Sequence, residues 1–141
     1  MFIRLTDTVS VAGQLAPDDI SDAAAAGFTH IVNNRPDGEQ AGQPPCSVMR
    51  AAAATAGLGY TAIPVDHHGM NPDQVAAMAA ALDATPGPVL AFCRSGTRSA
   101  NLWALAEAKR GGDADEIIAA AARGRYDVSG LRATLVSLAT P

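Results

Sequence analysis

Residues 93–99 have the types and spacing that suit nucleophilic chemistry on an anion, and they read CRSGTRS. Cysteine attacks as the thiolate, and a free cysteine with a pKa of about 8.5 is mostly protonated at neutral pH unless its surroundings favour the anion. Arg98, with Arg94 in reserve, would place positive charge beside Cys93. Gly96 would let the backbone fold closely around a bound group. The segment therefore predicts a functional thiol, since a cysteine that only packs in a core needs no neighbouring arginines.

The remaining groups of this segment are candidates for binding the substrate. We expect the backbone amides of residues 95–99, at the positive end of a following helix, to stabilise an anion formed on the sulfur. Ser99 could also hydrogen-bond the thiolate or a leaving sulfur. The predicted substrate-binding residues in the segment are Arg94, Ser95, Gly96, Thr97 and Ser99.

The flanking elements predict where the segment lies. Residues 88–92 have no polar side chain, which is typical of a strand buried on both faces of a parallel sheet, and residues 99–110 read as a helix. Strands and helices alternate along the chain, which predicts an α/β fold with a mostly parallel central sheet and helices on both sides. Residues 2–5 and 9–13 predict a short N-terminal hairpin at the sheet edge. Ligands of such sheets bind at the carboxyl ends of the strands.

The other predicted strands are residues 28–33 and 58–65, and the other predicted helices begin at residue 17 and cover 47–56, 72–84, 114–123 and 129–138. The clearest helix start is residues 71–74, which read NPDQ and combine an N-cap residue, a first-turn proline and a capping-box glutamine. Residues 34–45 form the longest irregular connection, and long loops in compact domains are often functional.

Length, composition and charge limit the classes of function. The 141 residues, 48% of them hydrophobic, predict a single domain over residues 1–141. A net charge of -4 argues against a general surface for nucleic acid or anionic membrane. The N-terminus lacks a basic and then apolar leader, and no stretch reaches the roughly 20 apolar residues of a membrane span. We therefore expect a cytoplasmic protein in which Cys46 and Cys93 are free thiols.

Two resemblances follow from these motifs. Residues 93–99 resemble the active loop of rhodanese sulfurtransferases, in which the cysteine carries a persulfide. The chain up to residue 110 is similar to the beta-lactamase-hydrolase-like phosphatase-like family, whose fold resembles that of the dual-specificity tyrosine phosphatases. The second resemblance rests on IVNNR at residues 31–35 with Glu39, on IPV at residues 63–65, and on PVLAFC at residues 88–93 leading into SANLWAL at residues 99–105.

The length of the loop separates the two chemistries. Loops of the resembled phosphatases place five residues between cysteine and arginine, usually after a histidine, whereas here four residues separate Cys93 from Arg98 and Phe92 takes the place of the histidine. One fewer N–H donor makes a smaller cradle for a phosphoryl group. We therefore expect sulfur transfer, in which Cys93 takes a sulfane sulfur from thiosulfate or a persulfide and passes it to a thiol acceptor. The rhodanese resemblance also implies a partner protein of sulfur metabolism.

A phosphomonoesterase is the alternative. Asp66 lies in the loop after an adjacent predicted strand, upstream of the cysteine as the general acid does in the resembled phosphatases. An oxygen leaving group needs such an acid, whereas sulfite does not. The enzyme would then act through a Cys93 phosphocysteine. A third class, a non-catalytic sensor of an anion or a persulfide, also remains open.

Two further residues could contact an anionic substrate. Arg35 follows a strand at the same sheet edge, although an ion pair with Asp37 or Glu39 is an equally good interpretation. His67 could contact the donor or act as a secondary acid. Its neighbour is also a histidine, but adjacent side chains project differently and His30 begins a separate strand, so we expect no metal and no cofactor.

Overall fold

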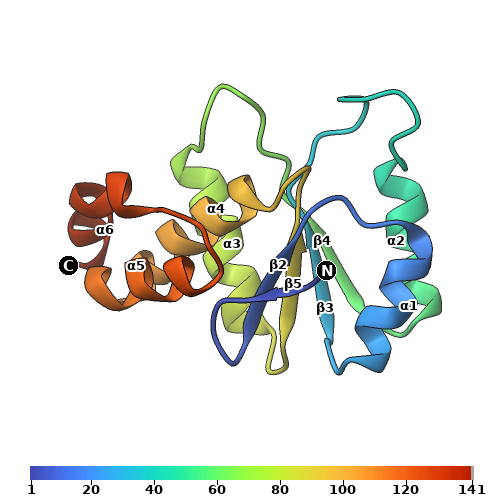
Figure 1. Cartoon of the computed structure of the whole chain (residues 1–141), viewed down its shortest axis with the longest axis horizontal. Helices are drawn as coiled ribbons and strands as arrows, with labels where there is room; N and C mark the ends of the chain where they lie inside the picture. Colours follow the sequence, from blue (N-terminus) through green and yellow to red (C-terminus); the bar gives the residue numbers. More distant parts are fainter. Residues whose placement is uncertain (141) are drawn as a thin grey trace.

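The computed structural model describes residues 1–140 and contains one five-stranded sheet (Figure 1). The strands lie in the order β1-β2-β5-β3-β4. Their bounds are Ile3–Arg4 for β1, Val9–Ala12 for β2, His30–Asn33 for β3, Gly59–Ala62 for β4 and Val89–Phe92 for β5. β1 is antiparallel to β2, and all other pairs are parallel. The predicted α/β fold, the edge hairpin and the central position of the strand before Cys93 are confirmed.

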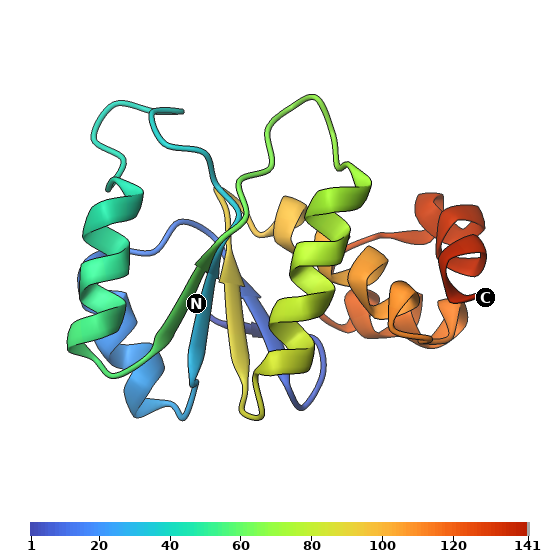
Figure 2. The same ribbon diagram turned by 180° about the vertical axis from the view of Figure 1, so that it is seen from behind.

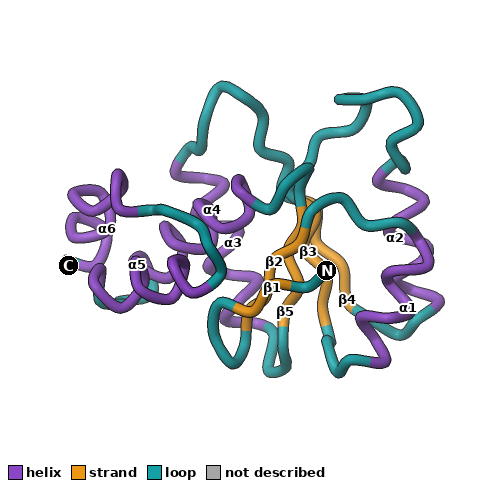
Figure 3. Tube along the Cα trace, in the orientation of Figure 1, coloured by secondary structure: helices purple, strands orange, loops and turns teal. Residues whose placement is uncertain are grey.

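Strand β5 is central because its four residues are all buried, as expected for a strand covered on both faces. Phe92, its last residue, is level with Ala12 of β2 on one side and with Asn33 of β3 on the other. The segments that leave these three strands therefore meet at one edge of the sheet. Above that edge, the loop before α2 and the loop before α3 extend away from the sheet on opposite sides (Figure 3).

Helices cover both faces of the sheet (Figures 1 and 2). Their bounds are Pro17–Ala25 for α1, Cys46–Thr55 for α2, Pro72–Ala84 for α3, Thr97–Lys109 for α4, Ala114–Arg123 for α5 and Arg132–Ala139 for α6, with a 3-10 turn at Ser129–Leu131. α1 and α2 pack together on one face, and α3 and α4 on the other. α5 and α6 pack against α4 at the opposite end of the molecule from α1 and α2.

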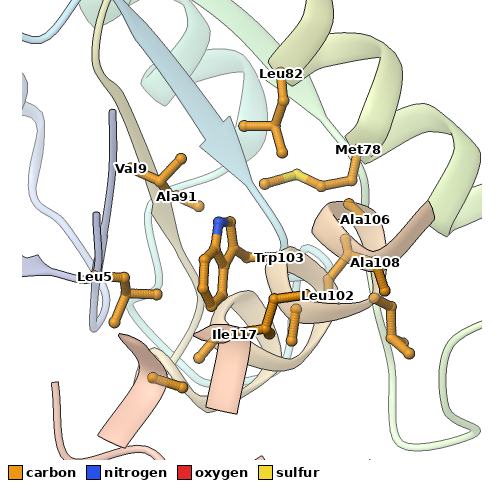
Figure 4. Close-up of a cluster of buried hydrophobic side chains, with 14 of the residues drawn as sticks. Leu5, Val9, Met78, Leu82, Ala91, Leu102, Trp103, Ala106, Ala108 and Ile117 are labelled. Carbon is orange, nitrogen blue, oxygen red and sulfur yellow. The ribbon is translucent and has the colours of Figure 1, made fainter. Parts of the chain in front are cut away.

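The larger apolar core lies between the sheet and α4 and surrounds Trp103 (Figure 4). Trp103 is only 1% exposed and packs among Val9 of β2, Ala91 of β5, Met78 of α3 and Ile117 of α5. Burying an aromatic ring of this size contributes much of the packing energy of a small core. The contacts hold α4 against the sheet, and they therefore fix the position of its first turn.

The largest differences between the observed and the predicted helices lie at the starts of two of them, and the other ends agree to within about one residue. α4 begins at Thr97, two residues before the predicted start at residue 99, so that Arg98 lies in its first turn. The prediction was late because Gly96 and the hydroxyl residues beside it resemble a turn, whereas Gly96 serves as the N-cap with a φ of +90°. The last predicted helix, residues 129–138, is instead a 3-10 turn followed by α6.

The predicted start of α3 is confirmed in atomic detail. Asn71 Oδ1 accepts the N–H of Gln74 at 2.8 Å, and Gln74 Oε1 accepts the N–H of Asn71 at 2.8 Å, which makes a reciprocal capping box. Gln74 also donates from Nε2 to the carbonyl of Pro64 at 2.8 Å. The cap therefore ties the start of α3 to the segment that leaves β4, at the edge where the site lies.

Candidate active site

The loop between β5 and α4 rests on the backbone that follows β2. The N–H of Cys93 donates to the carbonyl of Ala12 at 3.3 Å, and the N–H of Gln14 donates to the carbonyl of Arg94 at 3.1 Å. Gly13 fits beneath the loop because a Cβ there would lie 3.0 Å from the Arg94 oxygen. The neighbouring strand thus fixes the first residues of the loop through main-chain contacts.

The Cys93 sulfur lies under this loop as a free thiol, and the residue is fully buried. Its Sγ accepts the N–H of Gly96 at 3.1 Å. The sequence predicted that the backbone amides of residues 95–99 would bond the sulfur. Within residues 1–140, the amide of Gly96 is the only one of them that does so. Gly96 has a φ of +90°, a conformation that residues with a Cβ seldom adopt. Because the sulfur is covered, a substrate reaches it only when groups above it shift.

Arg98 extends from the first turn of α4 to the long loop after β3. Its Nη1 and Nη2 each donate to one oxygen of Glu39 at 2.8 Å, and Nη1 also donates to the carbonyl of Val65 at 2.7 Å. The bond from Glu39 raises the pKa of Arg98, with a smaller contribution from the charge of the Cys93 sulfur. A bidentate pair of this kind fixes the plane of the guanidinium. The cation is therefore already oriented before a substrate binds.

Glu39 joins two arginines, because its Oε1 also accepts from Arg35 Nε at 2.8 Å. The hydrogen bonds and charges of Arg98 and Arg35 lower the pKa of Glu39 to about 2, the bond from Arg98 being the largest cause. The carboxylate is therefore ionised throughout the neutral range. It docks the long loop, residues 34–45, beside the cysteine loop.

Arg35 is buried, and its other nitrogens bind Gln14 Oε1 at 3.0 Å and Gln40 Oε1 at 3.4 Å. Arg35 was expected either to contact an anionic substrate or to form an ion pair with Asp37 or Glu39. In the structure it forms the ion pair, and the partner is Glu39. Its guanidinium lines a smaller neighbouring cavity with Cys46. A role for Arg35 in gathering anionic substrates stays a prediction.

An open cavity of about 380 Å³ lies beside the cysteine loop and is lined by Glu39, His67, Arg94 and Arg98. Two of these side chains carry guanidinium groups, so the cations outnumber the single carboxylate. Arg94 is exposed at its rim. The cavity suits a small anion that would meet Arg94 and Arg98 together.

Asp66 is exposed in the loop after β4 and does not line that cavity. Its Oδ1 accepts the N–H of His68 at 2.8 Å and lies 3.2 Å from His68 Nδ1. These contacts lower the pKa of Asp66, the backbone bond being the largest cause. A general acid must hold a proton at the working pH. This arrangement therefore does not present Asp66 as an acid, and that role stays a prediction.

The serines and the threonine of the segment have different surroundings. Ser99 is buried, and its hydroxyl donates to Asn34 Oδ1 at 2.8 Å rather than to the sulfur. Asn34 in turn donates from Nδ2 to the carbonyl of Ile63 at 3.0 Å, so Ser99 links α4 to the ends of two strands. Ser95 and Thr97 are exposed, and their hydroxyls lie 3.1 Å apart. The predicted contact between Ser99 and the sulfur stays a prediction.

Tyr126 is a site residue that sequence reasoning missed. It lies in the connection after α5, and its hydroxyl donates to the carbonyl of Ser95 at 3.2 Å. The two residues are 31 positions apart. Tyr126 lies beyond the segment that carried the family resemblance, and no local motif marks it.

The histidines do not converge. The rings of His67 and His68 stack with centroids 4.2 Å apart, and His30 Nε2 lies 2.7 Å from the hydroxyl of Thr61. Within residues 1–140, no three His, Cys, Asp or Glu side chains gather as a metal site would require.

In the part of the chain that the structure describes, none of the helices has the length and apolar character needed to cross a membrane.

Solved structures resemble this fold over nearly the whole chain. A candidate phosphatase of Neisseria meningitidis is 29% identical, covers 96% of each chain and superposes with a TM-score of 0.81. Tk-PTP in its active form has a TM-score of 0.75 at 16% identity and covers 98% of this chain and 95% of its own, which supports the fold alone. The fold, with a cysteine and an arginine at the junction of β5 and α4, is that of a phosphatase-like domain.

The family follows from the sequence comparisons. Residues 2–110 match the family described as "Beta-lactamase hydrolase-like protein, phosphatase-like domain", and the chain belongs to it. A beta-lactamase hydrolase-like protein of Agrobacterium fabrum is 37% identical over 109 residues, and one from Xylella fastidiosa is 36% identical over 105 residues. These matches cover 77% and 74% of this chain but only 25% and 24% of the relatives. The comparisons favour the phosphatase alternative over sulfur transfer.

Proposed function

We propose that this domain hydrolyses phosphate monoesters through a covalent intermediate on Cys93. The observation that carries the proposal is that Cys93 follows the central strand β5 directly and Arg98 lies in the first turn of α4, where it lines an open cavity together with Arg94. Membership of a phosphatase-like family supports the same chemistry. The free state of Cys46 and Cys93 is consistent with a reducing compartment, and we place the reaction in the cytoplasm.

The steps use groups already described. The Cys93 thiolate attacks phosphorus, so that an S–P bond forms and the P–O bond to the leaving group breaks. Arg98 and Arg94 bind the phosphoryl oxygens. The loop beyond β4 turns inward, and the leaving oxygen takes a proton either from His67 or from Asp66 once Asp66 has separated from His68 and become protonated. Water then cleaves the S–P bond, which releases inorganic phosphate and restores the thiolate.

A second candidate is sulfur transfer, and one feature of the loop favours it. Only four residues separate Cys93 from Arg98, and one amide bonds the sulfur, so the cradle is small for a phosphoryl group. In this reaction the thiolate attacks the outer sulfur of thiosulfate, an S–S bond forms, and sulfite leaves with the electron pair of the broken bond. The thiolate of an acceptor, which can be a thiol of a partner protein of sulfur metabolism, then attacks the outer sulfur of the Cys93 persulfide. A new S–S bond forms on the acceptor, and Cys93 leaves as its thiolate.

The state of Asp66 agrees with this second candidate. Sulfite leaves as a stable anion and needs no proton, and Asp66 is held ionised by His68 outside the cavity. The two candidates therefore differ in their need for an acid as well as in the size of the cradle.

One pair of measurements separates the candidates. Intact mass after incubation with thiosulfate tests for one added sulfur that thiol treatment removes, and hydrolysis of an aryl phosphate tests for phosphatase activity. Phosphate release that is lost in Cys93→Ser and kept in Cys46→Ser, without a sulfur adduct, supports the proposed function. A sulfur adduct on Cys93 without phosphate release overturns it in favour of sulfur transfer. Binding of sulfate without either reaction supports a sensor.

A further inference from the structure

The Tyr126 hydroxyl and the Cys93 sulfur hold opposite ends of one peptide unit. The carbonyl of Ser95 accepts from Tyr126 Oη at 3.2 Å, and the N–H of Gly96 in the same unit donates to Cys93 Sγ at 3.1 Å. A trans peptide is planar, and its C=O and N–H point in opposite directions. Holding the carbonyl on one side therefore aims the N–H at the sulfur on the other.

Close packing at Gly96 reinforces this geometry. A Cβ placed at Gly96 would lie 2.2 Å from Tyr126 Oη and 3.1 Å from its Cζ. The tyrosine thus occupies the space that any larger residue would need, and the φ of +90° at Gly96 is retained beneath it. The ring lies against the one residue whose amide binds the nucleophile.

The backbone before Tyr126 has an uncommon conformation that directs it there. Arg125 has a φ of +68°, the one positive φ of a non-glycine residue in the described chain. The N–H of Arg125 bonds the carbonyl of Ala122 at 2.9 Å, and the N–H of Tyr126 bonds that of Ala121 at 3.0 Å. These two bonds make the Schellman motif, which ends many helices with a left-handed residue, so the end of α5 sets the direction in which the chain reaches Tyr126.

We propose that Tyr126 is a positioning residue for the nucleophile, acting through the Ser95–Gly96 peptide to keep an N–H on the Cys93 sulfur. The proposal rests on Cys93 being the nucleophile of the proposed function, but it holds for either candidate reaction. It assigns a role in the site to the helical region beyond residue 110, outside the match to the family.

The electrostatics of Tyr126 agree with this placement. Burial raises the pKa of its phenol, and the charge of the Cys93 sulfur raises that pKa further. The chain holds only two tyrosines, and Tyr60 hydrogen-bonds Asn33 and lies 3.2 Å from Cys46 Sγ, away from the loop. Tyr60→Phe is therefore a matched control.

The first test is alkylation of Cys93 by iodoacetamide without substrate, followed by peptide mass spectrometry. In Tyr126→Phe, the rate at neutral pH relative to its plateau at high pH falls about tenfold, the loss expected when a charge-assisted hydrogen bond is weakened. Tyr60→Phe leaves this ratio unchanged. In the Tyr126→Phe sample, where the contact between Tyr60 and Cys46 is intact, Cys46 reports any general change in reactivity. An unchanged ratio for Cys93 in Tyr126→Phe overturns the proposal.

The second test couples Tyr126 to Gly96. Gly96→Ala lowers the free energy of unfolding through its backbone strain and its clash with Tyr126 Oη. In a Tyr126→Phe background the clash with the oxygen is gone, so Gly96→Ala costs less. Equal costs in the two backgrounds contradict the contact. This measurement uses urea unfolding and needs no enzymatic activity.

A third test applies even if Tyr126→Phe fails to fold. In Tyr60→Phe, Tyr126 is the only tyrosine, and its ionisation is followed by ultraviolet absorbance. Adding Cys93→Ser removes the nearby negative charge, so the midpoint of the Tyr126 titration falls; an unchanged midpoint overturns the proposal. None of these readouts uses turnover. Failure of the proposed function instead appears as the absence of phosphate release by the unmodified domain.

Discussion

Two loops leave neighbouring parts of the same sheet edge, and they are held in different ways. The loop between β5 and α4 bonds to two separate segments, to Ala12 and Gln14 at the end of β2 and to Tyr126 after α5. In the loop between β4 and α3, residues 66–69 are exposed, and the Asp66 carboxylate bonds only His68 within the same loop. The first loop carries the nucleophile, and the second carries the two groups that could deliver a proton.

This difference separates the two steps of the proposed reaction, nucleophilic attack and protonation of the leaving group. In the proposed reaction, Cys93 and Arg98 are held by these contacts before a substrate binds, and only the groups that cover the sulfur have to shift, which lowers the entropy cost of reaching the reactive geometry. The proton-delivering groups are not arranged in this way. We infer that nucleophilic attack depends on the rigid loop, whereas protonation of the leaving group depends on movement of the exposed one.

The largest expected effect is that of Cys93→Ser. Turnover of any substrate falls by about three orders of magnitude or more, because a serine hydroxyl in this loop has no adjacent base to activate it. The unfolding curve changes little, since the side chain remains small and buried. Cys46→Ser, measured in parallel by the same rate assay, retains activity. A Cys93→Ser variant with more than a tenth of the original rate would falsify the role of the sulfur.

Arg98→Lys tests the other half of the rigid loop. We expect kcat/KM to fall about a hundredfold, because an ammonium cannot bond both Glu39 oxygens and the Val65 carbonyl in the plane of a guanidinium. Arg94→Lys is the control at the exposed rim and should cost only a few fold. Equal losses for both variants, in steady-state kinetics, would show that orientation of Arg98 is unimportant.

Glu39→Gln tests the ion pairs of Glu39 with Arg98 and Arg35 through the pH dependence of stability. The pKa of Glu39 falls from its ordinary value of 4.5 to about 2 in the folded state, so its ionised form stabilises the fold above pH 4.5. That contribution is lost as the pH falls from 4.5 towards 2. In Glu39→Gln this part of the pH dependence disappears, as measured by urea unfolding of both proteins across the window. If the free energy of unfolding has the same pH dependence in both proteins, these ion pairs do not stabilise the fold.

Asp66→Asn has the smallest expected effect. Its carboxylate bonds only within its own exposed loop, so neither the unfolding curve nor the alkylation rate of Cys93 should change. A fall in rate of about tenfold or more, confined to phosphate esters with poor leaving groups, would identify Asp66 as the acid. The same fall in His67→Asn alone would assign that role to His67. Destabilisation by Asp66→Asn would show that the loop is better anchored than its contacts indicate.

The elements that the sequence predicted well are those defined by local patterns. The apolar run before Cys93 is the central strand, and the capping box at Asn71 begins α3 as expected. The start of α4 was missed by two residues, because a glycine with positive φ can end a loop as well as interrupt a helix. Trp103 on an apolar helix face is buried, as its spacing indicates.

The site was only partly predictable, because local patterns reveal residues that are adjacent in sequence and not contacts between distant segments. The sequence named Cys93, Arg98 and the residues between them, because they are contiguous. It could not pair Arg98 with Glu39, which lies 59 positions away, or choose between the two interpretations of Arg35. Ser99 was assigned to the sulfur because it is near in sequence, whereas the fold presents it with the closer acceptor Asn34.

By itself the sequence determined an α/β chain with a thiol, a glycine turn and two arginines at the end of a buried strand, since periodicity and adjacency are local properties. Only the tertiary structure decided which distant groups hold that thiol and that cation in place. Contacts such as those of Tyr126 and Glu39 arise when strand order and helix packing bring remote segments to one edge of the sheet. No local pattern encodes them, because their partners are chosen by the packing of the whole domain.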